Sequence, residues 1–328
     1  NAIQFRFIGT TWDENSIHDC TLLIPNAGSG TGADGIAGGG SGYSLYNNTI
    51  AGYTTAYVGG QHQDGWQALS GSYIKIYGNT FIDIGNYPIF GDAMNGDFSH
   101  LWVYNNIIKL TSAGLQASVA PQGIAIGPDG GVFRNLGRYP TFTDIIIANN
   151  TIVDYGTHAA INLRNNKGQN SLFVECVITN NIAINSGDLG LDPAVASSNN
   201  IRISADDAAN LFVNYDNLSP TNDLRLKATA SALIGQGSDL SSLFSIDHAG
   251  TNRPSGMAWD VGAYQFNTDD VAPVFTLQPT SQTTQTGTTL SLTVLASGSP
   301  VPSYQWLKDG AAISGATSAT LTLSSVTP

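Results

Sequence analysis

Short runs of alternating hydrophobic and polar residues recur along the first 190 residues, and most of them break at an asparagine. Examples are YIKIYGNTFIDI (73–84), LWVYNNIIKL (101–110), DIIIANNTIVDY (144–155) and FVECVITNNIAI (173–184). Alternation among β-branched residues predicts short strands, whereas a helix would space its hydrophobic residues three and four apart. The pattern therefore predicts an all-β chain.

The asparagine breaks form an internal repeat. They occur at Asn48, Asn79, Asn106, Asn150 and Asn181, and HDCTL (18–22) is a degenerate earlier copy. A period of this length predicts a solenoid in which each repeat is one coil. Asparagine tolerates the left-handed backbone of a sharp turn, and equivalent side chains in successive coils can form a hydrogen-bonded ladder.

Through its YNNTI, YGNTF and ANNTI repeats, the segment up to about residue 190 resembles the right-handed parallel β-helices of the pectate lyase superfamily. This resemblance implies a parallel β-helix acting on a polysaccharide. The same architecture also carries glycosidases, epimerases, tailspikes and adhesins, so it specifies the fold more strongly than the chemistry.

Three further segments follow the repeats. Residues 190–266 end in RPSGMAWDVGAYQF (253–266), which is similar to the terminal segment of many secreted β-helix proteins and is expected to cap the solenoid. Residues 267–273 are expected to be a linker. Residues 274–328 resemble the first part of a bacterial immunoglobulin-like domain, with Trp306 at the core position of strand C. Because the later strands are missing, we expect a longer natural chain and strand sharing or self-association through this partial sandwich.

The two cysteines test the coil assignment. Cys20 and Cys176 fall about five coils apart, on the order of 24 Å at the spacing of neighbouring strands. A disulfide needs Cα atoms within about 7 Å of each other. We therefore expect two unpaired, mostly buried thiols.

The charge of the chain limits which binding partners are expected. Charged residues make up 11% of the chain and its formal net charge is -12, which disfavours nucleic acid. No apolar run has transmembrane length, so no membrane insertion is expected. The modular order, a β-helix followed by an immunoglobulin-like domain, predicts a secreted or cell-surface protein.

The segment HQDGWQALSG (62–71) and its counterparts in later coils carry the candidate chemistry. If the coils stack in register, Asp64, Asp92 and Asp129 place carboxylates along one outward face. Two such acids can act as acid and base on a glycosidic bond, or the cluster can bind calcium. Each is also compatible with an ordinary turn.

Basic residues group near the same face. A lyase acting on a uronate chain needs a cation beside the sugar carboxylate and a base for the C5 proton. The expected catalytic set is Asp64, Asp92, Arg164, Lys167 and His62; the expected substrate-binding set is Trp66, Gln67, Tyr87, His100, Arg134 and Arg138; the expected calcium ligands are Asp64, Asp92 and Asp129.

Three functions stay open from the sequence. The leading hypothesis is a secreted lyase that cleaves a uronate-containing polysaccharide, and the second is a glycoside hydrolase with paired aspartates. The third is a non-catalytic adhesin, carbohydrate-binding or filament-forming module.

Overall fold

The computed structural model describes residues 3–7, 9–24, 34–52, 64–112, 122–127, 138–163, 172–267, 271–299 and 302–324. The chain forms two compact units, Asn1–Phe266 and Asn267–Pro328.

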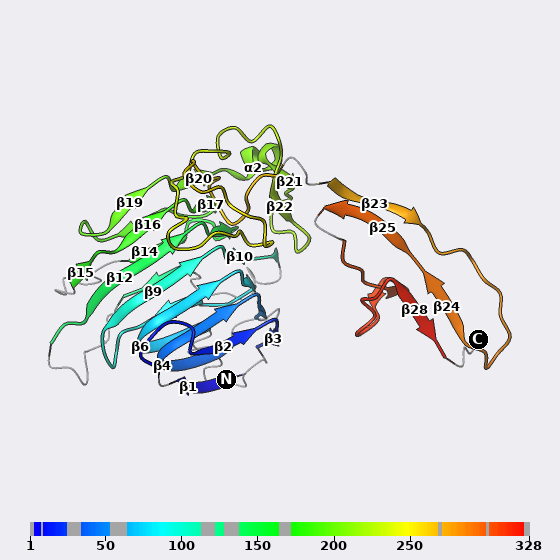
Figure 1. The fold of residues 1–328 in the computed structure, drawn as a ribbon, viewed down its shortest axis with the longest axis horizontal. Helices are drawn as coiled ribbons and strands as arrows, with labels where there is room; N and C mark the ends of the chain where they lie inside the picture. The colour runs from blue at the N-terminus through cyan, green and yellow to red at the C-terminus, as the bar shows by residue number, and fades with distance from the viewer. Residues whose placement is uncertain are drawn as a thin grey trace. The chain divides into compact units, whose positions relative to one another are not determined.

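The first unit is a parallel β-helix with three walls, and Figure 1 shows its strands stacked side by side. The first wall contains β8 (Tyr87–Gly91), β11 (Ile124–Ile126), β14 (Ile161–Leu163), β18 (Leu189–Leu191), β1 (Ile3–Phe7) and the N-terminal parts of β4 (Ile36–Tyr46) and β6 (Asp64–Tyr77). The second wall contains the C-terminal parts of β4 and β6 with β2 (Asn15–His18), β9 (Phe98–Tyr104), β12 (Thr141–Ala148), β15 (Leu172–Val174), β16 (Val177–Thr179) and β19 (Ala196–Ser198). The third wall contains β3 (Thr21–Leu23), β5 (Thr49–Ala51), β7 (Thr80–Ile82), β10 (Ile107–Lys109), β13 (Thr151–Val153), β17 (Ile182–Ile184) and β20 (Ile201–Ile203).

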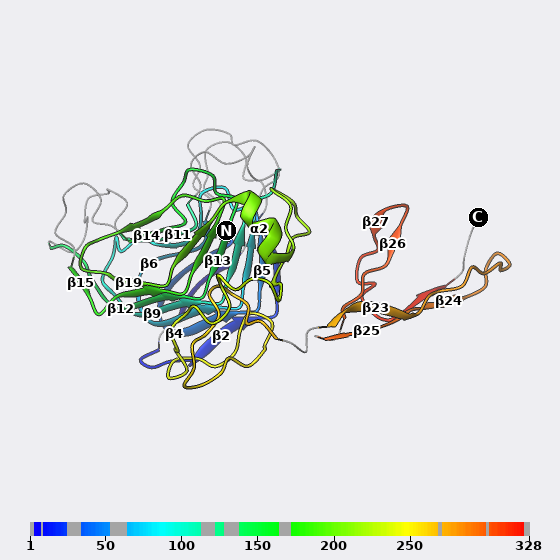
Figure 2. The same cartoon turned by 90° about the horizontal axis from the view of Figure 1, so that it is seen from above.

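One coil runs through β7, β8 and β9, turns at Asn105 and Asn106, and enters β10 one level higher. Because strands of successive coils pair in parallel and in register, side chains at equivalent positions form columns. Ile74, Leu101 and Ile145 form such a column inside the second wall, and all three are fully buried. Seen from above, strands of the different walls surround this core (Figure 2).

The predicted asparagine ladder is confirmed. The side-chain amide of Asn48 donates to Oδ1 of Asn79 at 3.0 Å, and that of Asn79 donates to Oδ1 of Asn106 at 3.1 Å. The same bond joins Asn106 to Asn150 and Asn150 to Asn181. The ladder extends one rung beyond the predicted repeats, to Asn200, which accepts from Asn181 at 2.8 Å.

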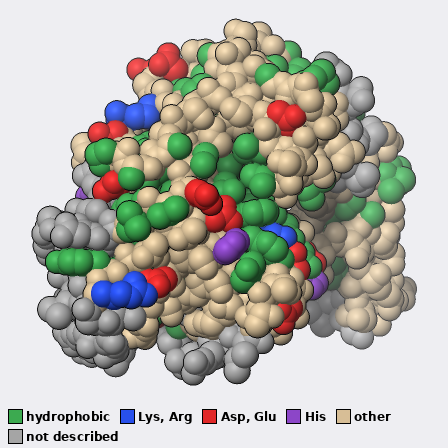
Figure 3. Space-filling view, turned by 60° about the vertical axis from the view of Figure 1, so that its left-hand side comes forward, with side chains coloured by type: hydrophobic (Ala, Val, Ile, Leu, Met, Phe, Trp, Pro, Cys, Tyr) green, Lys and Arg blue, Asp and Glu red, His purple; other side chains and the backbone are tan. Residues whose placement is uncertain are grey.

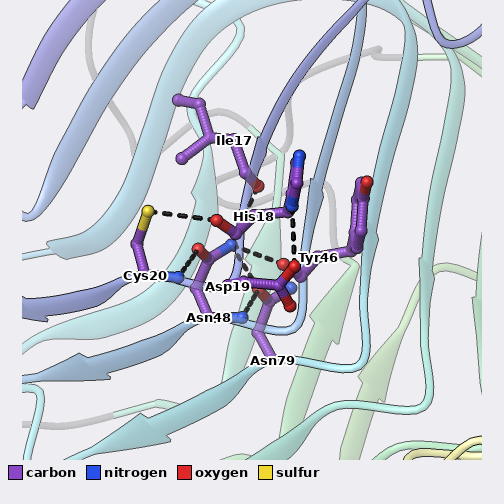
Figure 4. A network of polar contacts seen from close by, with 7 residues as sticks. All are labelled: Ile17, His18, Asp19, Cys20, Tyr46, Asn48 and Asn79. Carbon is purple, nitrogen blue, oxygen red and sulfur yellow. Dashed lines mark hydrogen bonds and ion pairs between the residues drawn. The ribbon is translucent and has the colours of Figure 1, made fainter.

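The lower end of the ladder explains the degenerate HDCTL copy (Figure 4). The backbone N–H of Cys20 donates to Oδ1 of Asn48 at 3.0 Å, so Cys20 occupies the rung where later coils have asparagine. Its thiol donates to the carbonyl of His18. Beside it, Nδ1 of His18 lies 2.8 Å from the carboxylate of Asp19.

Both thiols are unpaired, as predicted, but only one is buried. Cys176 continues the inner column of Ile145, and burial raises the pKa of its thiol to about 11. The expectation of burial was wrong for Cys20, because this residue lies on the lowest rung of the ladder, with no described coil beneath it.

The segment after the last coil contains α2 (Ala205–Leu211), β21 (Phe212–Asn214) and β22 (Asp223–Leu226), which pairs with β21 in antiparallel fashion. Its hydrophobic residues pack on the outward side chains of the third wall, including Ile107, Ile182 and Ile184. This segment therefore covers the side of the solenoid as well as its upper end (Figure 1).

One buried arginine joins this segment to the coils by hydrogen bonds. Arg253 is 3% exposed, and its guanidinium donates to Oδ1 of Asn105 at 3.0 Å and to the carbonyls of Gly262 and Ala263. It also lies against the ring of Trp259, 5.2 Å from the centroid. Burial lowers the pKa of Arg253 to about 10, which still leaves it charged at neutral pH.

The second unit contains β23 (Val271–Leu277), β24 (Leu290–Thr293), β25 (Leu295–Ser299), β26 (Leu307–Lys308), β27 (Ala311–Ala312) and β28 (Thr320–Leu323). β23 pairs with β25, and β24 pairs with β28, both antiparallel. Trp306 is half-buried in a groove of about 530 Å³, and Phe275 and Leu307 are largely exposed. The described part of this unit therefore exposes apolar side chains.

Candidate functional site

The residues expected to form the site belong mainly to the first wall. Asp64 is fully buried at the start of β6, where Oδ1 accepts the backbone N–H of Tyr87 at 3.1 Å. Trp66, two residues on, points into the core and donates to the hydroxyl of Tyr43 at 3.2 Å. Neither side chain is placed to meet a polysaccharide on the surface.

The structure does not bring Asp64 and Asp92 together. Asp64 is the register partner of Tyr87, and Asp92 lies five positions beyond Tyr87 along the chain. At ~3.3 Å per residue the two are about 16 Å apart along the strand direction, too far to act on one glycosidic bond. Asp92 is also buried.

The other expected residues are dispersed. Gln67 and Tyr87 are half-buried on the first wall, with the Tyr87 ring stacked on Phe90 at 4.5 Å. Arg138 is engaged in a bidentate ion pair with Asp97, which lowers the pKa of the Asp97 carboxyl chiefly through their hydrogen bonds. His62, Asp129, Arg134, Arg164 and Lys167 lie outside the described residues.

The calcium hypothesis stays a prediction. In the described part of the chain, no three His, Cys, Asp or Glu side chains group closely enough to hold a metal ion, and Asp129 falls outside that part. Nor does any described helix have the length and apolarity to cross a membrane.

A denser group of functional side chains lies on the outer face of the second wall. We call it the outer cluster: Trp12, Asp13, Tyr73, Lys75, His100, Trp102, Asp144 and Glu175. Figure 3 shows part of the surface, with a histidine side chain beside acidic and hydrophobic side chains.

A column of bent backbone presents part of this cluster. Tyr73, His100, Asp144 and Glu175 all have a positive φ between 53° and 55°, and they stack in register, above Gly42 at the same position of β4. A left-handed residue inside a strand bends the strand and redirects its side chain. The bend therefore recurs coil after coil and aligns these four side chains.

Several aromatic rings of the outer cluster contact one another. The His100 ring stacks on Tyr73 with centroids 4.4 Å apart, and the Trp12 ring lies 4.4 Å from that of Trp102. Trp12 comes from the loop between β1 and β2, where the carboxylate of Glu14 accepts the backbone N–H groups of Thr10 and Thr11 at 2.7 Å. That turn holds Trp12 over the second wall.

Asp144 is the titratable centre of the outer cluster. Its carboxylate accepts from the indole N–H of Trp102 at 3.2 Å and lies 4.0 Å from Nε2 of His100. Burial raises the pKa of Asp144, and the nearby charge of Glu175 adds to the rise. A carboxylic acid with a raised pKa beside a second carboxylate is an arrangement able to donate and accept protons.

The sequence pointed to His100 as a substrate-binding candidate, but it did not indicate that Trp12, Tyr73, Asp144 and Glu175 belong to the same site. A signal was present. Tyr73, His100, Asp144 and Glu175 each precede their ladder asparagine by six residues. Aligning the coils on that asparagine would have placed the four in one column.

One part of the chain matches a known protein family. Residues 272–328 match the family model of the immunoglobulin domain. No curated protein matches the chain. Among solved structures, the chain is similar to the crystal structure of pectate lyase Pel9A, with 16% sequence identity and a TM-score of 0.36 over 80% of this chain and 77% of that one. The strand pairing itself identifies the first unit as a parallel β-helix, and it is followed by a segment that matches the immunoglobulin domain.

Proposed function

We propose that this chain is a secreted, polysaccharide-active β-helix protein whose sugar-binding surface is the outer cluster of the second wall. The observation that carries the proposal is the alignment of Tyr73, His100 and Asp144 in one column beside two tryptophan rings. Aromatic rings offer the flat apolar surface on which sugar rings stack, and the polar groups between them supply hydrogen bonds. An adhesin or carbohydrate-binding module would use the same surface without cleavage.

The described residues favour acid–base hydrolysis. Asp144, with its raised pKa, is suited to protonate a glycosidic oxygen, and Glu175 in the next coil is suited to act on water or on the sugar. His100 lies close enough to Asp144 to stabilise the carboxylate that remains after the proton has left.

Lyase chemistry on a uronate chain is the second candidate. It is supported by the basic residues Arg164 and Lys167 in the sequence, which lie beyond the described ranges. On the outer cluster itself the lysine, Lys75, is paired with Asp13 at 2.6 Å, so its charge is already compensated.

The test is an activity screen over neutral, amino-containing and uronate-containing polysaccharides. Hydrolysis predicts new reducing ends without an unsaturated product, and Asp144→Asn is expected to lower kcat by about 10²- to 10⁴-fold, the range of general acid catalysis. Asp206→Asn, at an exposed acid of α2, is the matched control and should keep full activity.

The outcomes separate the candidates. Products that absorb in the ultraviolet through a new double bond would replace hydrolysis by the lyase reaction. Binding without cleavage of any polysaccharide would favour the adhesin or binding module. Absence of both binding and cleavage would refute the proposal.

A further inference from the structure

The charge of the outer cluster points to a particular class of sugar. Its described carboxylates are Asp13, Asp144 and Glu175, and its described basic side chains are Lys75 and His100, whose Nε2 lies 4.0 Å from the Asp144 carboxylate. Asp13 and Lys75 compensate each other through their ion pair. Asp144 and Glu175 then leave this part of the wall with an excess of negative charge.

The contacts of Lys75 show how an ammonium group is bound in the outer cluster. Nζ of Lys75 lies 2.6 Å from the Asp13 carboxylate, 5.0 Å from the centroid of the Trp12 ring and 5.8 Å from that of Trp102. A carboxylate combined with indole faces is a favourable environment for a cation, because both the charge and the ring quadrupole attract it.

The neighbouring part of the cluster offers two further carboxylates without a described lysine. Asp144 lies beside the same Trp102 ring, which donates to it, and Glu175 follows one coil later. Burial and the charge of Glu175 both disfavour the ionised form of Asp144, and an incoming cation would relieve the second effect. An anionic uronate would instead add a like charge beside the partly buried Asp144 carboxylate, which is unfavourable.

We propose that the outer cluster prefers a polysaccharide of amino sugars with free amines, such as a polyglucosamine chain, over neutral and uronate chains. This inference rests on the proposed function and adds the substrate class. The ammonium groups of the chain would face Asp144 and Glu175, while its rings lie against Trp102 and Tyr73.

Calorimetric titration of the whole chain with three oligosaccharides of equal length tests the preference. The ligands are oligomers of glucosamine, N-acetylglucosamine and galacturonate, in mildly acidic buffer where the glucosamine amines are protonated. The glucosamine oligomer is expected to bind about tenfold or more tightly than the neutral oligomer, and the difference should shrink as salt is added. The galacturonate oligomer should bind most weakly.

Substitutions in the outer cluster test which residues cause the preference for the glucosamine oligomer. Asp144→Asn combined with Glu175→Gln should remove the preference, so that the glucosamine oligomer and the neutral oligomer bind this variant with equal affinity. Asp206→Asn should change neither. If the neutral or uronate oligomer binds as tightly as the amine, or if the double variant keeps the preference, this inference is overturned while the proposed function stands. If none of the three binds and no polysaccharide in the activity screen is bound, the proposed function fails with it.

Discussion

Two adjacent positions in each coil perform different tasks, and both favour asparagine. The first, at Asn47, Gly78, Asn105, Asn149, Asn180 and Asn199, has a left-handed backbone. The second, from Asn48 to Asn200, supplies the ladder. Glycine replaces asparagine only at the first position, because that position needs a backbone conformation, whereas the second needs an amide side chain.

In the upper coils, the side-chain amide of the first position also donates hydrogen bonds to the segment that follows the last coil. Asn149 donates to the carbonyls of Asp260 and Gly262 at 3.0 Å, and Asn180 donates to the carbonyl of Ser238 at 2.9 Å. The turn asparagines and Arg253 therefore join the same segment to the coils. The resemblance of RPSGMAWDVGAYQF (253–266) to terminal segments of β-helix proteins predicted a cap, and it gave no indication that the segment also covers the side of the solenoid.

Asp144 yields a prediction at the residue scale. Since its pKa is raised in the folded state, its contribution to stability is present at low pH and is lost as pH rises through the folded pKa. Asp144→Asn should therefore unfold at a urea concentration equal to or above that of the wild type at neutral pH, although it lowers activity.

Urea unfolding of both proteins at acidic and neutral pH checks this prediction. The advantage of Asp144→Asn should be larger at neutral pH than in acid. A variant that is less stable than the wild type only at neutral pH would show that the ionised carboxylate stabilises the fold, contrary to the direction of its pKa shift.

At the scale of elements, the stacked strands depend on the ladder between them. Asn106 is fully buried, its amide donates to the carbonyls of Ile76 and Tyr104 and to Asn150, and its Oδ1 accepts from the backbone and side chain of Asn79. Each of these partners would lose its bond if the side chain were removed. Buried groups without partners cost about 1–3 kcal/mol each.

Asn106→Ala is therefore expected to lower the free energy of unfolding by about 3–5 kcal/mol. Asn200→Ala, at the half-buried upper rung, is the matched comparison and should lose clearly less. Denaturant unfolding followed by circular dichroism measures both. Equal losses at the two positions would show that ladder bonds do not gain strength from burial.

The strands themselves could largely be predicted, because their alternation and the asparagine markers are local signals in the sequence. YIKIYGNTFIDI forms the end of β6, the turn and β7 as expected. The outward column was harder to predict, since coil lengths of 27 to 44 residues obscure which residues share a level. Register is fixed by the hydrogen bonds between neighbouring coils within each wall, which the local pattern does not contain.

At the scale of the whole molecule, the sequence located the repeats, the capping segment and the immunoglobulin-like segment, but it placed the candidate site on the first wall. Asp64 was expected on an outward face and Trp66 in contact with substrate, yet both lie in a strand and are buried. Inward and outward positions alternate, so a single shift in assumed register exchanges core and surface. Trp12 was beyond such reasoning because it reaches the second wall from a loop near the N-terminus.

The partial immunoglobulin-like unit carries a separate proposal about assembly. Its groove beside Trp306 and its exposed Phe275 and Leu307 are suited to accept further strands. Strand sharing or self-association through this unit would join neighbouring chains independently of the sugar-binding surface on the β-helix.

The central claim, that the second wall binds the polysaccharide, is tested most directly by a crystal structure of the chain with an amino-sugar oligosaccharide. The account predicts sugar rings against Trp102 and Tyr73, with polar groups of the sugar within hydrogen-bond distance of Asp144. An oligosaccharide bound instead along the outer face of β8, β11 and β14, with the second wall empty, would contradict it.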